Sequence, residues 1–300
     1  MILADCNMEA YTNTTLIQGF FCAFLHDFYN RKDVLAISSK FNKITVIISV
    51  LIVGFGVVFA YNAYNHYLWL RDGQLAQQNY EIMYTIFEET ISELSNPVSQ
   101  NNLQNPVEIT PLQQARKLTN NQDIIAYISI PGTNINHVVV QSDNNDFYLY
   151  HDMFGTRNVA GAIFMDYRNS SNFFDKSTIL YGHNMQNGTM FHNLRYFLHT
   201  PGFAQNNRYI TIITDDDVLV YQVFAVFSTG IYFNYIQVFF ETEEEFEKLL
   251  QKMADRSVYN AGFKPTYADN ILVLSTCTNV DRNTRIVVVG KKIQLSENYE

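Results

Sequence analysis

The sequence predicts a mainly β domain with flanking helices, an eight-stranded barrel or sandwich placed after a single transmembrane helix. Eight short runs rich in β-branched and aromatic residues follow residue 122. Turn signals such as Pro131-Gly132 separate several of these runs. Before them, the 27 residues Ile44–Leu70 contain no Asp, Glu, Lys or Arg. Such an uncharged stretch is typical of a helix that crosses a membrane.

The composition excludes several classes of protein. With 47% hydrophobic and 16% charged residues, the chain of 300 has ample apolar side chains for a folded core. Lys and Arg number 20 against 29 Asp and Glu, which gives a net charge of -9. A general nucleic-acid binder needs clustered basic residues to neutralise phosphates, so we expect no nucleic-acid partner. Residues 1–64 hold four basic and four acidic side chains, so the negative charge lies beyond them.

The uncharged segment is interpreted as an uncleaved membrane anchor at residues 44–64. About 20 apolar residues span a bilayer, and Tyr and Trp collect at its interface, as they do between Tyr61 and Trp69. A cleaved signal would begin closer to the N-terminus. Lys40 and Lys43 precede the segment, so the positive-inside rule places residues 1–43 in the cytoplasm as a tail. The alternative is a buried helix of a soluble protein.

Residues 65–121 are expected to form a juxtamembrane helical region and a linker. Between Gln74 and Leu94, Met83, Phe87 and Ile91 recur at helical spacing, which predicts an amphipathic helix. The segment Ser95–Pro111 contains three prolines and many polar residues, which is typical of a linker. The folded domain is therefore expected at residues 122–300, outside the cell.

The folded domain contains the eight predicted strands and one clear helix. The helix begins at Thr242, which forms a capping-box pattern with Glu245, and Phe246 opens its apolar stripe. The acidic run at its start is explained by the helix dipole and does not require a metal site. The strands are expected at Asp123–Ile130, Asn136–Gln141, Gly161–Tyr167, Ser177–Gly182, Arg208–Thr214, Val218–Thr229, Asn270–Cys277 and Arg285–Ile293.

Three residues at strand ends are candidates for catalysis. His183 follows one strand, Cys277 ends another, and Arg285 opens the last. A thiolate is the reactive form of Cys, an imidazolium can stabilise it and donate a proton to a leaving amine, and a guanidinium can hold an oxyanion. Cys277 is the one cysteine after the anchor, which indicates a reactive thiol or intermolecular pairing, with a buried inert cysteine as the alternative.

The residues around these candidates resemble the active-site elements of sortases, the membrane-anchored cysteine transpeptidases of Gram-positive bacteria. The elements are LSTCTN at Leu274–Asn279, YGHN at Tyr181–Asn184, and an Arg directly before IVVVGK. The family usually has Thr-Leu-x-Thr-Cys, and this chain has Val273 in place of the first Thr. Class B is indicated by the long N-terminal helical region, by the capped helix before the seventh strand, and by Ser275.

The resemblance implies a closed eight-stranded β-barrel and a reaction. Cys277 would attack the Thr carbonyl of a C-terminal sorting motif on a secreted protein, His183 would protonate the departing amine, and Arg285 would stabilise the tetrahedral intermediate. A peptidoglycan cross-bridge amine would then attack the thioester, and the secreted protein would become attached to the wall. Ser275 and Thr276 are expected to bind substrate. This chemistry requires no metal or organic cofactor.

Two other functions remain open at this point. A cell-wall Cys-His hydrolase, such as an amidase or papain-like peptidase, normally has its Cys before its His, whereas His183 precedes Cys277 by 94 residues here. A non-catalytic anchored binding module would need no particular Cys, His and Arg at strand ends. An unreactive Cys277 thiol in the folded domain would favour that module.

Overall fold

The computed structural model describes residues 43–95, 109–230, 232–277 and 283–294. The chain divides into two compact units, one ending at Arg71 and the other running from Asp72 to Glu300. The boundary falls inside helix α3 (Lys43–Ser95). The second unit contains every described strand and all the residues of the candidate site. It therefore begins within helix α3.

The described part of the first unit is the apolar half of α3. Its side chains are mostly exposed, including Ile52, Val53, Phe55 and Phe59. The helix that begins here is long and apolar enough to cross a membrane, judged by length and composition. The long apolar helix expected from the sequence is therefore present.

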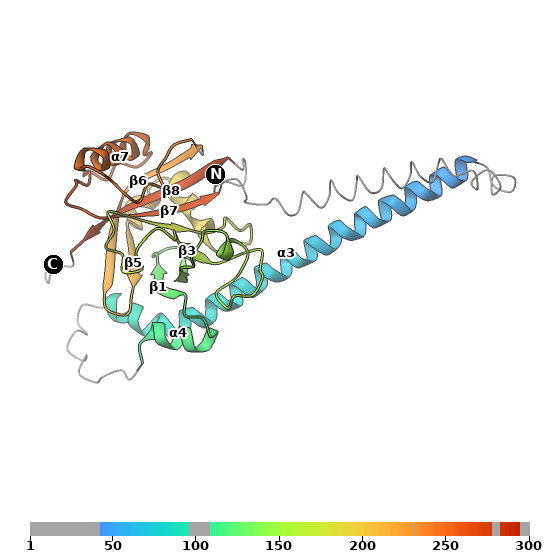
Figure 1. Cartoon of the computed structure of the whole chain (residues 1–300), viewed down its shortest axis with the longest axis horizontal. Helices are drawn as coiled ribbons and strands as arrows, with labels where there is room; N and C mark the ends of the chain where they lie inside the picture. Colours follow the sequence, from blue (N-terminus) through green and yellow to red (C-terminus); the bar gives the residue numbers. More distant parts are fainter. Residues whose placement is uncertain (1–42, 96–108, 231, 278–282, 295–300) are drawn as a thin grey trace. The chain divides into compact units, whose positions relative to one another are not determined.

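In the second unit, eight strands close into a barrel in the order β1-β2-β3-β4-β7-β8-β6-β5 (Figure 1). The pairs β2/β3 and β4/β7 are parallel, and the other neighbours are antiparallel. The prediction of an eight-stranded domain is confirmed, and the barrel rather than the sandwich is correct. The strands are β1 (Ile124–Ser129), β2 (Asn136–Val140), β3 (Ile163–Met165), β4 (Ser177–Tyr181), β5 (Tyr209–Ile213), β6 (Val218–Gly230), β7 (Ile271–Cys277) and β8 (Thr284–Ile293).

The second half of α3 packs on the barrel. Met83 and Phe87, part of the predicted apolar stripe, are 1% and 0% exposed and belong to the main hydrophobic cluster. The Phe87 ring stacks on Tyr127 of β1 with ring centroids 4.0 Å apart. Burying such side chains fixes the helix to the barrel, since each contributes about 1.5–3 kcal/mol of burial free energy.

Helix α4 (Pro111–Thr119) was not predicted from the sequence. Thr110 caps it, and Gln113 completes a capping box, because its side chain accepts from the Thr110 amide at 3.0 Å. Arg116 then donates to the Ile124 carbonyl at 2.7 Å and pairs with Asp215 at 2.8 Å. These contacts hold α4 beside β1, as Figure 1 shows.

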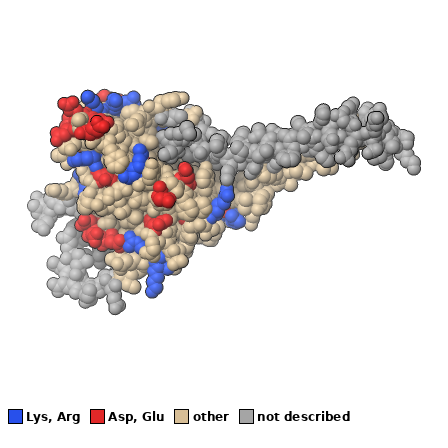
Figure 2. Space-filling model, viewed as in Figure 1, with Lys and Arg blue, Asp and Glu red and all other residues tan. Residues whose placement is uncertain are grey.

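Helix α7 (Glu243–Arg256) lies between β6 and β7 in the chain and packs against β6. Thr242 accepts from the Glu245 amide at 3.2 Å, as predicted, but the Glu245 carboxylate accepts from the Glu241 amide at 2.9 Å instead of closing the box at Thr242. The predicted stripe is buried. Figure 2 shows acidic and basic side chains mixed on this helix. The shorter helices are η2 (Phe147–Leu149), η3 (Phe191–Asn193), α5 (Leu194–His199) and α6 (Phe203–Asn206).

Candidate active site

Strands β4, β7 and β8 are neighbours in the barrel, and their ends bring together the three residues singled out from the sequence. β4 and β7 pair in parallel through five residue pairs that end at Tyr181 and Ser275, each pair 94 residues apart. His183 and Cys277 have the same separation and stand two positions beyond that last pair. Across the other edge of β7, Cys277 is directly opposite Arg285.

The result is a row of three positions, His183–Cys277–Arg285, across three adjacent strands. The structure places Cys277 by its backbone. The pairing continues toward it, because the Gly182 amide donates to the Ser275 carbonyl at 3.3 Å. Neighbouring strands lie roughly 4.8 Å apart, so the three backbone positions fall within roughly 10 Å. This distance suits side chains that act on one reacting group.

His183 is a half-buried imidazole held by a backbone carbonyl. Its Nε2 lies 2.8 Å from the Leu149 carbonyl oxygen, which can only accept, so Nε2 carries the hydrogen and Nδ1 has the lone pair in the neutral ring. Burial lowers the pKa of His183, while the Leu149 hydrogen bond opposes this shift, and the net change is downward. The resting ring is therefore neutral near pH 7, where it can accept a proton.

Gly161 supports the position of the His183 ring. Its φ is +59°, and a Cβ there would lie 2.6 Å from the Tyr148 carbonyl oxygen and 3.2 Å from Cδ2 of His183. No other residue type fits without displacing one of these groups. In the sequence this glycine was only the first residue of a predicted strand, and the long-range approach to His183 was not visible there.

Arg285 is buried at the other end of the row, with 2% of its surface exposed. Its backbone pairs with Cys277 on one side and with Thr229 of β6 on the other. Its Nη1 donates to the Thr284 carbonyl at 3.2 Å. Burial raises the pKa of Tyr235, and the Ser275 hydrogen bond and the Arg285 charge oppose that rise. The Arg285 charge is thus close enough to act on groups beside Ser275.

Ser275 and Thr276 precede Cys277 on β7, and both are 2% exposed. Ser275 Oγ and Tyr235 Oη form a hydrogen bond of 2.8 Å. Among the described residues, Thr276 Oγ1 has no hydrogen-bond partner. Successive side chains of a strand point to opposite faces, so the two hydroxyls lie on opposite faces of β7. The contact from Tyr235 was not predicted, because nothing local in the sequence connects residues 40 positions apart.

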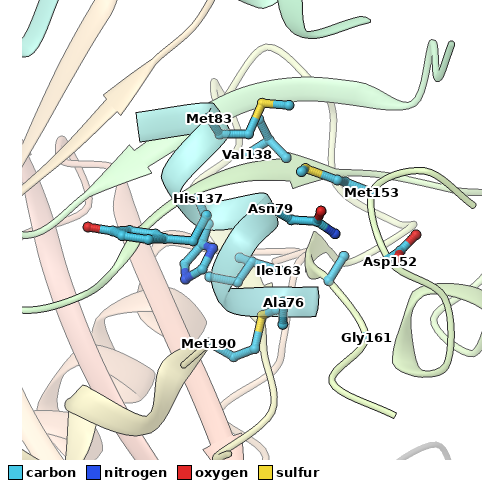
Figure 3. Close-up of a pocket in the computed structure, with 12 residues that line it drawn as sticks. Ala76, Asn79, Met83, His137, Val138, Asp152, Met153, Gly161, Ile163 and Met190 are labelled. Carbon is cyan, nitrogen blue, oxygen red and sulfur yellow. The ribbon is translucent and has the colours of Figure 1, made fainter. Parts of the chain in front are cut away.

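A cavity lies beneath α3, and none of the three row residues lines it, although Gly161, which approaches the His183 ring, does (Figure 3). Its volume of about 30 Å³ is large enough to hold water. His137, Asp152 and three methionines, among others, form its walls. Within the described ranges, no group of three His, Cys, Asp or Glu side chains is arranged to hold a metal ion.

The row has the groups that acyl transfer by a thiol requires. A cysteine can form a thioester, a neutral imidazole can take and return a proton, and a fixed guanidinium can stabilise a negatively charged tetrahedral oxygen. The register places the backbones of these three residues next to one another at one end of the barrel.

Comparison with known proteins gives one consistent family. The family model described as a sortase domain matches residues 128–293. Sortase B of Listeria monocytogenes is 38% identical over 190 residues, which cover 61% of this chain and 74% of the relative. Sortase B of Staphylococcus aureus is 29% identical over 259 residues, which cover 86% and 100%.

Solved structures give the same result. A Staphylococcus aureus sortase B–substrate complex matches with a TM-score of 0.64 and 30% identity, covering 74% of this chain and 98% of that one. Clostridium perfringens sortase B matches with a TM-score of 0.56 and 33% identity, covering 60% and 98%. At these identities the similarity extends beyond the fold to the family.

Proposed function

The chain belongs to the sortase family, and from this we propose that it is a class B cysteine transpeptidase in which Cys277, His183 and Arg285 are the catalytic residues. The observation that carries the assignment of residues is the register of β4, β7 and β8, which aligns the three positions in one row. The named relatives and structures are sortases of class B. They favour neither a cell-wall hydrolase nor a non-catalytic binding module.

The reaction begins at the sulfur of Cys277. The thiolate attacks the carbonyl carbon of Thr in the sorting motif of a secreted protein, and the new C–S bond gives a tetrahedral intermediate. The C–N bond to the next residue then breaks, the amine leaves with a proton, and a thioester remains on Cys277. An amine of the peptidoglycan cross-bridge attacks this thioester, forms a new amide and releases the thiol.

His183 carries the proton between these steps. Because burial lowers its pKa, the neutral ring predominates near pH 7 and can accept the proton of the Cys277 thiol. The resulting imidazolium donates that proton to the leaving amine and later accepts one from the incoming amine. The Leu149 carbonyl fixes the ring through Nε2, so the exchange would use Nδ1.

Arg285 stabilises the oxygen of the tetrahedral intermediate. The burial of its side chain supports this role, since a charge in a dry site acts more strongly on a developing anion than an exposed one. Ser275 and Thr276 are proposed to bind substrate, and the alternation of the strand gives each a different face.

The domain organisation is proposed from the sequence pattern. Residues 44–64 anchor the protein in the cell membrane, residues 1–43 lie in the cytoplasm, and residues 65–121 connect the anchor to the catalytic domain at 122–300. The exposed apolar side chains of α3 support the anchor, because a helix in lipid presents such a surface. The barrel would then act at the outer surface, where secreted substrates and wall amines meet.

A peptide library tests this function. The full chain, purified in detergent, is incubated with peptides that carry varied sorting motifs, and cleavage is read by mass spectrometry. We expect cleavage after Thr for one motif class and transfer to an added oligoglycine or diaminopimelate amine. The variant Cys277→Ala is the control. Cleavage of no motif by the wild-type chain, or equal cleavage by the variant, would contradict the proposal.

A further inference from the structure

The segment between β6 and α7 lies beside the His183–Cys277–Arg285 row. Residues 232–242 have no helix or strand, yet Tyr235 is fully buried and Val238 is 5% exposed. Tyr235 bonds to Ser275, two residues before Cys277, and its pKa responds to the charge of Arg285. Segment 232–242 therefore lies against β7, beside the candidate catalytic residues. No strand pairing holds the segment there, so other contacts must fix its position.

Arg168 supplies a second tether for this segment. Its Nη2 donates to the Ile236 carbonyl at 3.0 Å, one residue after Tyr235. The same guanidinium binds Asp166 through two parallel bonds, from Nε at 2.8 Å and from Nη2 at 2.7 Å. A guanidinium held in this fork has a fixed plane, so its remaining N–H has a fixed direction. That direction leads to Ile236.

Asp166 holds the Arg168 guanidinium in place. It is 0% exposed, and its carboxylate also accepts from Tyr181 Oη at 2.9 Å and from Asn145 Nδ2 at 3.1 Å. Burial alone would raise the pKa of Asp166, but the hydrogen bonds from Arg168 and Tyr181 outweigh it and hold the pKa below its usual value. The carboxylate is thus a stable buried charge with its partners in place.

These contacts connect the residues on the two sides of Ser275. Tyr181 of β4 is the register partner of Ser275, and Tyr235 is its hydrogen-bond partner. Asp166 binds Tyr181, and Arg168 binds the residue that follows Tyr235. One ion pair therefore connects the β4 side and the β6–α7 side of the strand that ends at Cys277.

We propose that Arg168 is a positioning residue, which Asp166 orients, and that it holds segment 232–242 against β7 so that the peptide-binding surface beside Cys277 is formed before substrate arrives. The proposal rests on the proposed function, because a peptide must bind there. Arg168 is not expected to touch the reacting atoms. Its loss should weaken peptide binding and leave the thiol itself unchanged.

The chain contains a matched control for this tether. Arg116 also binds a carboxylate, Asp215, and a backbone carbonyl, Ile124. Asp215 lies in the turn before β6, whereas Arg285 pairs with Thr229 near the other end of that strand. The two ends are roughly 35 Å apart along an extended strand. Arg116→Lys therefore removes the same kind of contact far from the row.

The experiment compares Arg168→Lys, Arg116→Lys and the wild-type full chain in detergent. Lysine keeps the charge beside Asp166 but cannot form the fork and reach Ile236 together. For Arg168→Lys we expect hydrogen exchange of amides in residues 232–242 to rise roughly tenfold and KM for a sorting peptide to rise roughly tenfold, with kcat changed less than about twofold. Arg116→Lys should change none of these, and iodoacetamide should alkylate Cys277 at the same rate in all three.

Three results would overturn the proposal. Wild-type exchange and KM in Arg168→Lys would show that the tether does not position the segment. Faster exchange throughout the barrel would assign Arg168 to global stability, and an equal KM effect of Arg116→Lys would show a nonspecific cause. If the wild-type chain cleaves no sorting peptide, the proposed function fails, while the exchange of residues 232–242 still decides whether the tether exists.

Discussion

The end of the β4–β7–β8 sheet contains the half-buried His183 and the cavity beneath α3 contains the buried His137, and desolvation lowers the pKa of both rings. His183 has a carbonyl partner at Nε2 and stands in register with Cys277. His137 packs against Tyr80 with ring centroids 5.4 Å apart, and among the described residues its Nε2 has no hydrogen-bond partner. Desolvation thus lowers the pKa of both rings, but the two rings differ in the groups that surround them.

This difference shows that a shifted pKa does not identify a catalytic histidine. Desolvation acts on any buried imidazole, whether or not a reacting group is near it. In the proposed mechanism, the Cys277 thiol, whose strand position is in register with His183, is the partner of His183 in proton transfer. The following experiments test that distinction, from the largest expected effect to the smallest.

Replacing the nucleophile should have the largest effect. We expect Cys277→Ala to abolish cleavage and transpeptidation, because the thioester cannot form. The melting temperature should stay within a few degrees of wild type, since the change removes one sulfur at a strand end. Mass spectrometry of wild-type protein with a slow substrate should show a peptide adduct on Cys277. Measurable turnover by the variant would exclude the thiol mechanism.

Substitutions of His183 and His137 should differ clearly in their effect on kcat. His183→Ala should lower kcat by roughly 100- to 10,000-fold, the usual contribution of a general acid–base group. His137→Gln should leave kcat nearly unchanged, because the cavity beneath α3 contains none of the row residues. His192→Ala is a further control, since His192 belongs to η3 and contacts Tyr196. A loss at position 137 or 192 as large as at 183 would mean that the row is wrongly assigned.

Arg285 should show the next largest effect. Arg285→Lys keeps a positive charge but not the planar fork, so turnover should fall roughly 100- to 1,000-fold, the loss typical of one oxyanion donor. Arg282, which lies outside the described residues, is the comparison, and Arg282→Ala should change turnover little. Steady-state cleavage of one sorting peptide by both variants distinguishes them. A greater loss at position 282 would transfer the role there.

His137 should make the protein less stable in acid. Its pKa is about 6.5 unfolded and about 4 in the folded protein, so between these values the unfolded chain binds more protons. The free energy of unfolding should therefore be intact above pH 6.5 and fall by about 3 kcal/mol as the pH drops to 4. His183 and His192 add to the same trend, since their pKa values are also lowered.

Urea unfolding at pH 7 and pH 4.5 measures this trend. In His137→Gln the difference between the two pH values should be smaller than in wild type, because one of the protonating groups is gone. Asp152, which lines the same cavity and whose pKa burial raises, stays in place in both proteins. An unchanged difference would show that His137 is already solvated or charged at neutral pH.

The sequence by itself determined the elements of this protein. Runs such as Asn270–Cys277 become strands because β-branched and apolar side chains suit a pleated, buried surface. The Thr242 cap and apolar stripe of α7 are local patterns, and the structure has both. The residues His183, Cys277 and Arg285 were also found from short motifs at strand ends. Each of these signals lies within a few positions along the chain.

Only the tertiary structure decided how the elements pair and what holds the site. The 94-residue spacing of His183 and Cys277 gains its meaning from the parallel pairing of β4 with β7, which no local pattern encodes. The contacts of Leu149 with His183 and of Arg168 with Ile236 join distant segments. Helix α4 has a local capping box at Thr110 and Gln113, but with nine residues it needs packing against β1 to be stable. Such long-range hydrogen bonds and burial depend on the geometry between strands rather than on neighbours in the chain. They therefore become favourable only once the barrel has closed.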